Sequence, residues 1–301
     1  MVRLPQPRLG RSALTLLACL AAACGLLLPL AAQADPAALR ARYEQLAPQL
    51  RNSDYGQPLH IASREDGDTL HGEVHALLEH PFERVRDALR DPTNWCDILI
   101  LPFNIKYCHA VRTPDGPGLL VRIGRRYDQP LDQSYRLLFD FRGVAASQDY
   151  FEARLAAPDG PVGTRDYHIV VSAIPVSQGR SFLRLNYSYG SGFAGRLAMQ
   201  AYLATAGADK VGFTREQDAG NGAALIGGVR GAVERNVMRY YLAIDAFLDS
   251  LSAPRGERAE RRIQSWFNAT ERYPRQLREM DRTTYVEMKR MEQERQQTLL
   301  Q

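Results

Sequence analysis

The sequence predicts an α+β domain in which a curved antiparallel β-sheet wraps around one long C-terminal α-helix. Three observations support this prediction: strand-like segments alternate between apolar and polar residues, turn-rich segments separate them, and a long amphipathic segment follows. Alternation indicates strands with one covered and one solvent-facing side, which antiparallel sheets allow and buried parallel sheets do not. The segments TPDGPG (113–118), APDGPVG (157–163) and SQGR (177–180) are typical of hairpin turns.

The first 34 residues have the pattern of a secretory signal peptide. Arginines precede an apolar run over residues 13–32, and a small-residue Ala-Gln-Ala site follows directly before Asp35. The run is also long enough for an uncleaved membrane anchor, and lipid attachment at Cys19 or Cys24 is a further alternative. We expect cleavage before Asp35 and a mature protein that is periplasmic or secreted.

The net charge limits which classes of partner we expect, and the cysteines indicate a disulfide in an oxidising compartment. The signal segment holds three arginines and no acidic residue, so its removal lowers the formal net charge from +4 to +1. Such a charge gives no strong field toward nucleic acid, and we expect no nucleic-acid partner; peripheral contact with a membrane stays open. In an oxidising compartment, Cys96 and Cys108 predict one disulfide that closes a short loop. Two buried free thiols are the alternative.

The first half of the mature chain is predicted to run from a helical lead into a strand and two short helices. Residues 35–63 are expected to form the lead and an irregular linker, and residues 69–78 the first strand, because their apolar residues alternate. Pro81 and Pro92 then open two short helices that end near residues 89 and 99. Asp91 is placed to cap the second of these helices.

Four further strands are predicted over residues 119–127, 135–141, 167–173 and 182–189. Each has a covered side that is mainly apolar and an opposite side that is polar. The covered sides consist of Leu119, Val121, Ile123, Arg125 and Tyr127; Tyr135, Leu137, Phe139 and Phe141; Tyr167, Ile169, Val171 and Ala173; and Leu183, Leu185, Tyr187 and Tyr189.

The long helix is predicted from about Gly228 to Leu251, where apolar residues recur at helical spacing on one stripe that includes Asn236 and Tyr240. We expect this stripe to cover the apolar side of the sheet. Beyond it, residues 253–301 are predicted to form a charged helical tail that is separable from the domain. Its few apolar residues are expected to dock on the domain or on a second copy.

The order of these elements resembles the START-related, helix-grip superfamily (SRPBCC), which also holds polyketide cyclases and birch-pollen-allergen-type proteins. The residues that carry the resemblance are HGEVHALLEHPFERVRDALRDPTNW (71–95) and RGAVERNVMRYYLAIDAFLDSL (230–251), and it covers roughly residues 64–252. The resemblance implies a helix-grip fold whose two short helices close one end of the concave side of the sheet.

Polar side chains on the otherwise apolar covered sides predict a site for a mainly apolar ligand with one polar end. We therefore expect a binding or transfer protein for a hydrophobic small molecule, such as a lipid or a sterol-like compound. Internal hydrogen bonds that only stabilise the core are the alternative. A concave side without a pocket of about 300 Å³ would contradict the ligand interpretation. The candidate residues are Arg125, Tyr127, Tyr135, Tyr167, Tyr187, Tyr189, Asn236 and Tyr240.

Other motifs do not lead to a cofactor or a metal ion. GSGFAG (190–195) fits a dinucleotide-binding pattern, but the strand before it has one polar side, so we expect no cofactor there; a hinge for a helix that caps the cavity is the functional alternative. His71 and His75 lie about 13 Å apart on a strand, too far to share a metal ion. An enzyme of the cyclase or hydrolase type, and an envelope protein that acts through its tail, remain alternatives to a non-catalytic binding protein.

Overall fold

The structure is a computed structural model that describes residues 35–124, 129–205, 207–216 and 224–298. The predicted signal peptide, including Cys19 and Cys24, and the candidate site residues Arg125 and Tyr127 lie outside these residues. From Pro36 onward the described chain forms one compact unit. None of its helices is both long and apolar enough to span a bilayer.

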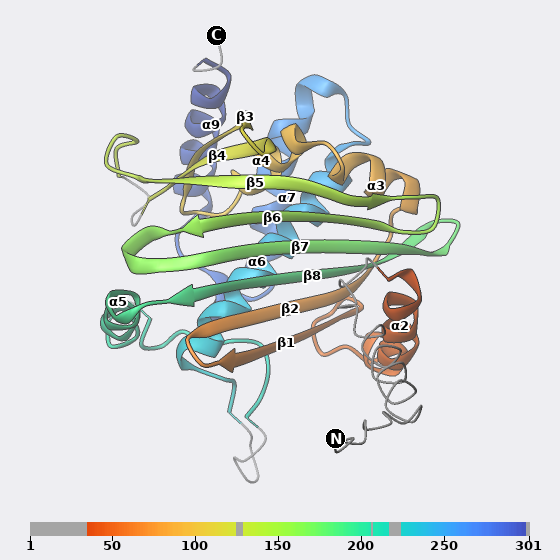
Figure 1. The fold of residues 1–301 in the computed structure, drawn as a ribbon, viewed down its shortest axis with the longest axis horizontal. Coiled ribbons are helices and arrows are strands. Elements are labelled where there is room, and N and C mark those ends of the chain that lie inside the picture. The colour runs from red at the N-terminus through yellow and green to blue at the C-terminus, as the bar shows by residue number, and fades with distance from the viewer. Residues whose placement is uncertain (1–34, 125–128, 206, 217–223, 299–301) are drawn as a thin grey trace, which may run out of the picture. The chain divides into compact units, whose positions relative to one another are not determined.

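The described residues form a single sheet of eight antiparallel strands in the order β1-β2-β8-β7-β6-β5-β4-β3 (Figure 1). This confirms the predicted antiparallel sheet. The strands are β1 (Leu59–Asp66), β2 (Thr69–Leu78), β3 (Ile105–Thr113), β4 (Gly116–Ile123), β5 (Tyr135–Ala146), β6 (Phe151–Asp159), β7 (Thr164–Ser177) and β8 (Arg180–Ser191).

Strand β1 lies where the sequence predicted an irregular linker, so the predicted first strand is the second one. It pairs with β2 from Leu59 opposite Ala76 to Asp66 opposite Thr69. Its first half buries Leu59 and Ile61, but its second half is charged and exposed. The sequence therefore does not alternate between apolar and polar residues along the whole strand. The hairpin turn contains Gly67 at φ 59°, and the Asp-Gly pair at 66–67 is the signal that was missed.

The predicted helices lie where the helix-grip fold requires them, and the fold class is confirmed. The two short helices after β2 are α3 (Phe82–Leu89) and α4 (Pro92–Leu99), and the Asp91 side chain accepts a 2.9 Å hydrogen bond from Thr93 N–H at the start of α4. The long helix α6 (Gly228–Ser250) crosses one face of the sheet (Figure 1). Gly72 on β2 permits this close approach, because a Cβ there would lie 3.1 Å from the Val233 carbonyl oxygen.

Further helices surround this arrangement. On the outer face of the sheet, the Tyr43 ring of α2 lies 5.2 Å from the ring of Phe182 on β8. Besides α2 (Pro36–Arg51), these elements are the 3-10 helices η2 (Pro161–Gly163) and η3 (Arg255–Glu257), and the helices α5 (Phe193–Leu203), α7 (Arg258–Glu271), α8 (Pro274–Leu277) and α9 (Arg282–Thr298).

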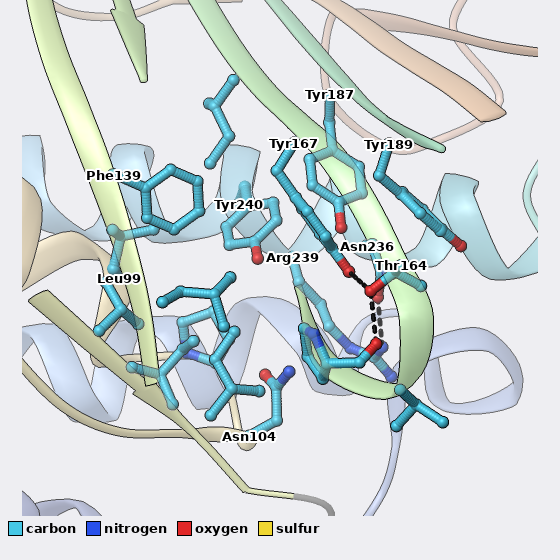
Figure 2. Close-up of a pocket in the computed structure, with 18 of the residues that line it drawn as sticks. Leu99, Asn104, Phe139, Thr164, Tyr167, Tyr187, Tyr189, Asn236, Arg239 and Tyr240 are labelled. Carbon is cyan, nitrogen blue, oxygen red and sulfur yellow. Dashed lines mark hydrogen bonds between the residues drawn. The ribbon is translucent and has the colours of Figure 1, made fainter. Parts of the chain in front are cut away.

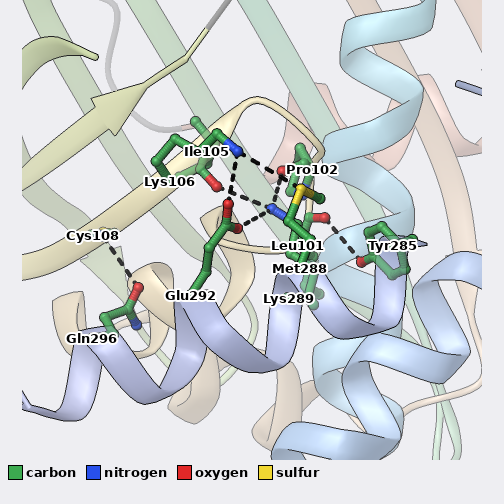
Figure 3. A network of polar contacts seen from close by, with 10 residues as sticks. All are labelled: Leu101, Pro102, Ile105, Lys106, Cys108, Tyr285, Met288, Lys289, Glu292 and Gln296. Atoms are coloured by element: carbon green, nitrogen blue, oxygen red, sulfur yellow. Dashed lines mark hydrogen bonds and ion pairs between the residues drawn. The ribbon is translucent and has the colours of Figure 1, made fainter. Parts of the chain in front are cut away.

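Residues 253–298, predicted as a charged helical tail, contribute buried side chains to the same core as the sheet. Trp266 and Tyr285 are fully buried, and Phe267 is 3% exposed. Helix α9 lies against edge strand β3, where Lys106 and Glu292 form a buried ion pair with Nζ and Oε1 3.0 Å apart (Figure 3). The high charge of this segment suggested solvation; in the structure, part of that charge is neutralised internally and buried.

The predicted disulfide joins Cys96 on α4 to Cys108 on β3, with the two Cα atoms 5.1 Å apart. The neighbouring Trp95 is 1% exposed, and its indole N–H donates a 2.8 Å hydrogen bond to the Leu89 carbonyl oxygen. The hydrogen bond therefore joins α4 to the end of α3, and the disulfide joins α4 to edge strand β3. This corner forms one end of the concave face that carries the site.

Candidate functional site

A cavity of about 260 Å³ lies between the concave face of the sheet and α6 (Figure 2). Its lining comes from α4, the loop after it, strands β3, β4, β5, β7 and β8, η2, α5 and α6. This volume is slightly below the pocket size of about 300 Å³ that the ligand interpretation requires. Two further hollows, of about 410 and 500 Å³, are more open to solvent and are lined mainly by polar residues.

The cavity has two different walls. One is aliphatic and includes Leu99, Val121 and Leu137. The other is a cluster of four tyrosines: the rings of Tyr167 on β7 and Tyr189 on β8 stack with centroids 5.3 Å apart and planes 13° apart, and Tyr187 lies 5.3 Å from Tyr240 across the gap to α6. Tilted and offset ring pairs of this kind hold one another in place. This tyrosine wall is Tyr167, Tyr187, Tyr189 and Tyr240.

The structure brings together five of the eight candidate site residues. The tyrosine wall and Asn236 all line the cavity, because alternation along β7 and β8 and helical spacing along α6 turn them toward the same space. Tyr135 is outside the lining: it begins β5 and is half-buried against the core. A residue at a strand end can share a side with lining residues without reaching the cavity, so the site role expected of Tyr135 stays a prediction.

The hydroxyl groups of the tyrosine wall differ in their hydrogen bonds. Tyr167 donates to Thr164 Oγ1 at 2.9 Å, and Thr164 donates to the Pro161 carbonyl oxygen at 2.5 Å. Within the described part of the chain, the hydroxyls of Tyr187, Tyr189 and Tyr240 have no hydrogen-bond partner. Figure 2 shows the Tyr240 hydroxyl pointing into the space between the walls.

Burial keeps these phenols neutral. Desolvation raises the pKa of Tyr167, Tyr187, Tyr189 and Tyr240 above the ordinary value for tyrosine. A protonated phenol can donate one hydrogen bond and accept others. The unpartnered hydroxyls can therefore bind an acceptor atom of a molecule in the cavity.

Sequence reasoning missed several lining residues, including Asn104, Thr164 and Arg239. Arg239 follows Asn236 by three residues on α6, so helical spacing was a usable signal for it. Asn104 and Thr164 lie in a loop and at a strand start, where no period applies. The suggested cap is present in part, since Ala198 and Met199 of α5 line the cavity.

Arg239 joins the cavity to the segment before α9. Its Nη1 donates to Asn236 Oδ1 at 3.4 Å, and its Nη2 lies 2.5 Å from Glu279 Oε1. The side chain is 14% exposed. The polar end of the cavity therefore contains a guanidinium whose charge is neutralised by a carboxylate from the C-terminal segment.

The described residues contain no group of three or more His, Cys, Asp or Glu side chains arranged to hold a metal ion. His71 and His75 both lie on β2, and His75 is 1% exposed on the outer side of the sheet. Among the described residues, neither of its ring nitrogens has a hydrogen-bond partner.

No family model matches the chain. No curated protein matches it in sequence. Solved structures that match include Ara h 8.0201, at 10% identity over 64% of this chain and 99% of that chain, with a TM-score of 0.36. A START superfamily protein from Mycobacterium smegmatis matches at 14% identity over 49% of this chain and 89% of that chain, with a TM-score of 0.32.

A norcoclaurine synthase point mutant from Thalictrum flavum, in complex with a transition-state analogue, matches at 10% identity over 47% of this chain and 84% of that chain, with a TM-score of 0.31. The fold is the START-related helix-grip fold. This assignment rests on the element order and sheet topology described above, and at these identities and TM-scores nothing about function follows from the matches.

Proposed function

We propose that the protein binds a small, mainly apolar molecule in the cavity, with the polar end of that molecule near Asn236 and the tyrosine wall. The observation that carries the proposal is that Tyr187 and Tyr240 face the cavity with hydroxyls that have no protein partner. A phenol hydroxyl that faces a cavity can donate one hydrogen bond to a bound molecule and accept others. A molecule with an acceptor atom between the walls would use these hydroxyls while its apolar body contacts the aliphatic wall.

The volume of the cavity limits the size of the ligand that it can hold. About 260 Å³ lies just under the range of roughly 300–1,000 Å³ that is usual for sites of drug-sized ligands. The lipid or sterol-like ligand expected from the sequence therefore stays a proposal, and the cavity favours compact molecules within that class. A larger ligand would require α5 to move outward.

We also propose that the mature protein begins at Asp35 and is periplasmic or secreted. The Cys96–Cys108 disulfide supports this, because such bonds persist in oxidising compartments. On α5, beside the cavity, Phe193 is 77% and Leu197 57% exposed, which supports peripheral contact with a membrane. N-terminal sequencing of protein from the extracellular or periplasmic fraction tests the cleavage site, and protein that retains residues 1–34 would contradict it.

Binding is better supported than the two alternative functions. No Asp, Glu, His, Cys or Ser side chain is among the described residues that line the cavity, so no observation there favours a cyclase or a hydrolase. The large apolar residues of the C-terminal segment, Trp266, Phe267 and Tyr285, are buried in the protein's own core. They are therefore not available for an envelope partner.

A pair of substitutions on one helix tests the binding site. Ala198→Trp fills the cavity from α5, whereas Leu197→Trp places the same side chain at a 57% exposed position. With N-phenyl-1-naphthylamine as a neutral fluorescent probe, we expect Ala198→Trp to weaken binding at least about tenfold and Leu197→Trp to leave it unchanged. Equal affinities in the two variants, or no binding by the unsubstituted protein, would contradict the proposal. Native mass spectrometry with organic extraction would identify any molecule that co-purifies.

A further inference from the structure

The charged side chain at the polar end of the cavity is paired with a residue outside the cavity. Arg239 is the one charged residue among the described residues that line it. Its charge is compensated by Glu279, which precedes α9 and is not itself part of the lining. The guanidinium also lies over the Phe103 ring, with Cζ 5.8 Å from the ring centroid, so aromatic and carboxylate contacts hold it together.

Glu279 balances more than one positive charge at this position. Its Oε2 lies 3.9 Å from Lys210 Nζ, while its Oε1 contacts Arg239. The pKa of Lys210 is lowered, mainly by desolvation, with Arg239 and Arg235 lowering it further and Glu279 opposing them. Glu279 is therefore the carboxylate that Arg239 and Lys210 share at this end of the cavity.

We infer that Glu279 is a specificity-determining residue that neutralises and positions Arg239, so that the cavity accepts an uncharged polar head group and rejects an anionic one. The inference rests on the proposed function. Burying a charge is costly unless it is paired, so loss of the Glu279 carboxylate would make an anion a more favourable partner for the Arg239 guanidinium. With the carboxylate present, an anionic head group would have to displace Glu279 or lie close to its like charge.

Two probes with the same apolar body test the charge preference. N-phenyl-1-naphthylamine is neutral, and 1-anilinonaphthalene-8-sulfonate carries one sulfonate on the same ring system. Only the signal that Ala198→Trp removes is counted as cavity binding. The unsubstituted protein should bind the neutral probe more tightly, and Glu279→Gln should shift the affinity ratio toward the sulfonate by about tenfold or more.

Glu260→Gln is the matched control. It makes the same change in net charge, but Glu260 pairs with Arg290 at the surface, where the two side chains are 43% and 57% exposed. We expect Glu260→Gln to leave the ratio unchanged. An equal shift in both variants would show a general effect of net charge and would overturn the inference.

Arg239→Met removes the other member of the Arg239–Glu279 pair. It replaces Glu279→Gln as the test if that variant does not fold. It leaves the Glu279 carboxylate beside the cavity, so the ratio should move further toward the neutral probe. If Arg239→Met leaves the ratio unchanged, or if the unsubstituted protein prefers the sulfonate, the inference is wrong while the proposed binding function stands. If the unsubstituted protein binds neither probe in the cavity, the proposed function fails and the inference fails with it.

Discussion

The contact between α9 and β3 and the cavity beside α6 both bury polar groups, but they leave those groups in opposite states. At the first, the Lys289 ammonium donates to the carbonyl oxygens of Pro102 at 2.8 Å and Ile105 at 3.0 Å and to Glu292 Oε2 at 2.7 Å (Figure 3). These three acceptors match the three donors of a lysine. In the cavity, the hydroxyls of Tyr187 and Tyr240 have no such partners in the described chain.

This difference separates structural polar groups from groups that are available to a ligand. The α9–β3 contact includes a second lysine, Lys106, and the amide oxygen of Gln296, which accepts a 3.2 Å hydrogen bond from the Cys108 backbone N–H. The edge of the sheet is thereby covered, which protects it from pairing with another chain. A polar network that satisfies itself stabilises one structure, whereas hydroxyls that face a cavity without a protein partner are available to another molecule.

The largest expected effect is on the α9–β3 contact. Glu292→Gln would leave Lys106 and Lys289, each no more than 2% exposed, without their shared carboxylate. We expect a loss of about 3–5 kcal/mol in the free energy of unfolding, measured with urea. Glu260→Gln, which breaks a surface pair, should cost at most about 1 kcal/mol. Similar losses in the two variants would show that the buried network is not what holds α9.

The disulfide is expected to contribute slightly less. Cys96→Ser with Cys108→Ser opens a loop with a sequence separation of 12, and we expect a loss of about 3 kcal/mol in the free energy of unfolding. Thiol titration of unfolded, unreduced mature protein should find no free thiol. Two titratable thiols, or a double variant as stable as the parent, would contradict the role given to this bond.

His75 sharpens the comparison, because neither of its buried ring nitrogens has a hydrogen-bond partner among the described residues; its Nε2 lies 3.9 Å from Glu73 Oε1. Burial is the main cause that lowers its pKa from 6.5 to about 4. Between these values the unfolded chain binds more protons than the folded one, so the free energy of unfolding should fall as the pH falls from 6.5 to 4. At about 1.36 kcal/mol per pKa unit, the lowering of this pKa from 6.5 to about 4 corresponds to a contribution of roughly 3 kcal/mol.

His75→Phe is the control for this pH dependence, since a phenyl ring can keep the stack on Phe182, whose ring lies 5.7 Å away. Asp245 acts in the opposite direction: its pKa is raised to about 6, mainly by burial, so it favours the folded state as the pH falls. The contribution of Asp245 is the same in the unsubstituted protein and in His75→Phe, so it cancels when their free energies of unfolding are subtracted. Equal pH profiles for the two proteins would show that His75 has no such effect.

The smallest expected effect compares one substitution in the two regions. Tyr285→Phe removes a hydroxyl that donates to the Leu101 carbonyl oxygen at 3.0 Å, and should lower the free energy of unfolding by about 1–3 kcal/mol without changing probe affinity. Tyr187→Phe removes a hydroxyl that has no partner in the described chain. It should change the free energy of unfolding by less than about 1 kcal/mol. It should also weaken binding of a ligand that hydrogen-bonds to this hydroxyl about three- to tenfold. The reverse pattern would break the distinction between the two regions.

Residue periods alone predicted the framework of the site. Alternation along β7 and β8 and helical spacing along α6 were enough to direct the tyrosine wall and Asn236 to one side. The same rules did not identify β1, because its second half is charged and weakens the alternation. They also placed Tyr135, at the start of β5, on the covered side, although it does not line this cavity. Periodicity says which side a residue faces, but it does not say whether a cavity reaches that residue.

Only the tertiary structure decided how the buried charges are compensated. Lys289 is 184 residues from Ile105, whose carbonyl oxygen it binds, and Glu279 reaches Arg239 across α7 and α8. In the sequence these residues look like parts of a charged, solvated tail. Their effect depends on distance and desolvation between segments far apart in the chain, because a charge pair is strong only where water is excluded. The sequence therefore determined which side chains face the concavity, and the packing of the C-terminal segment determined how the charged residue at its polar end is paired.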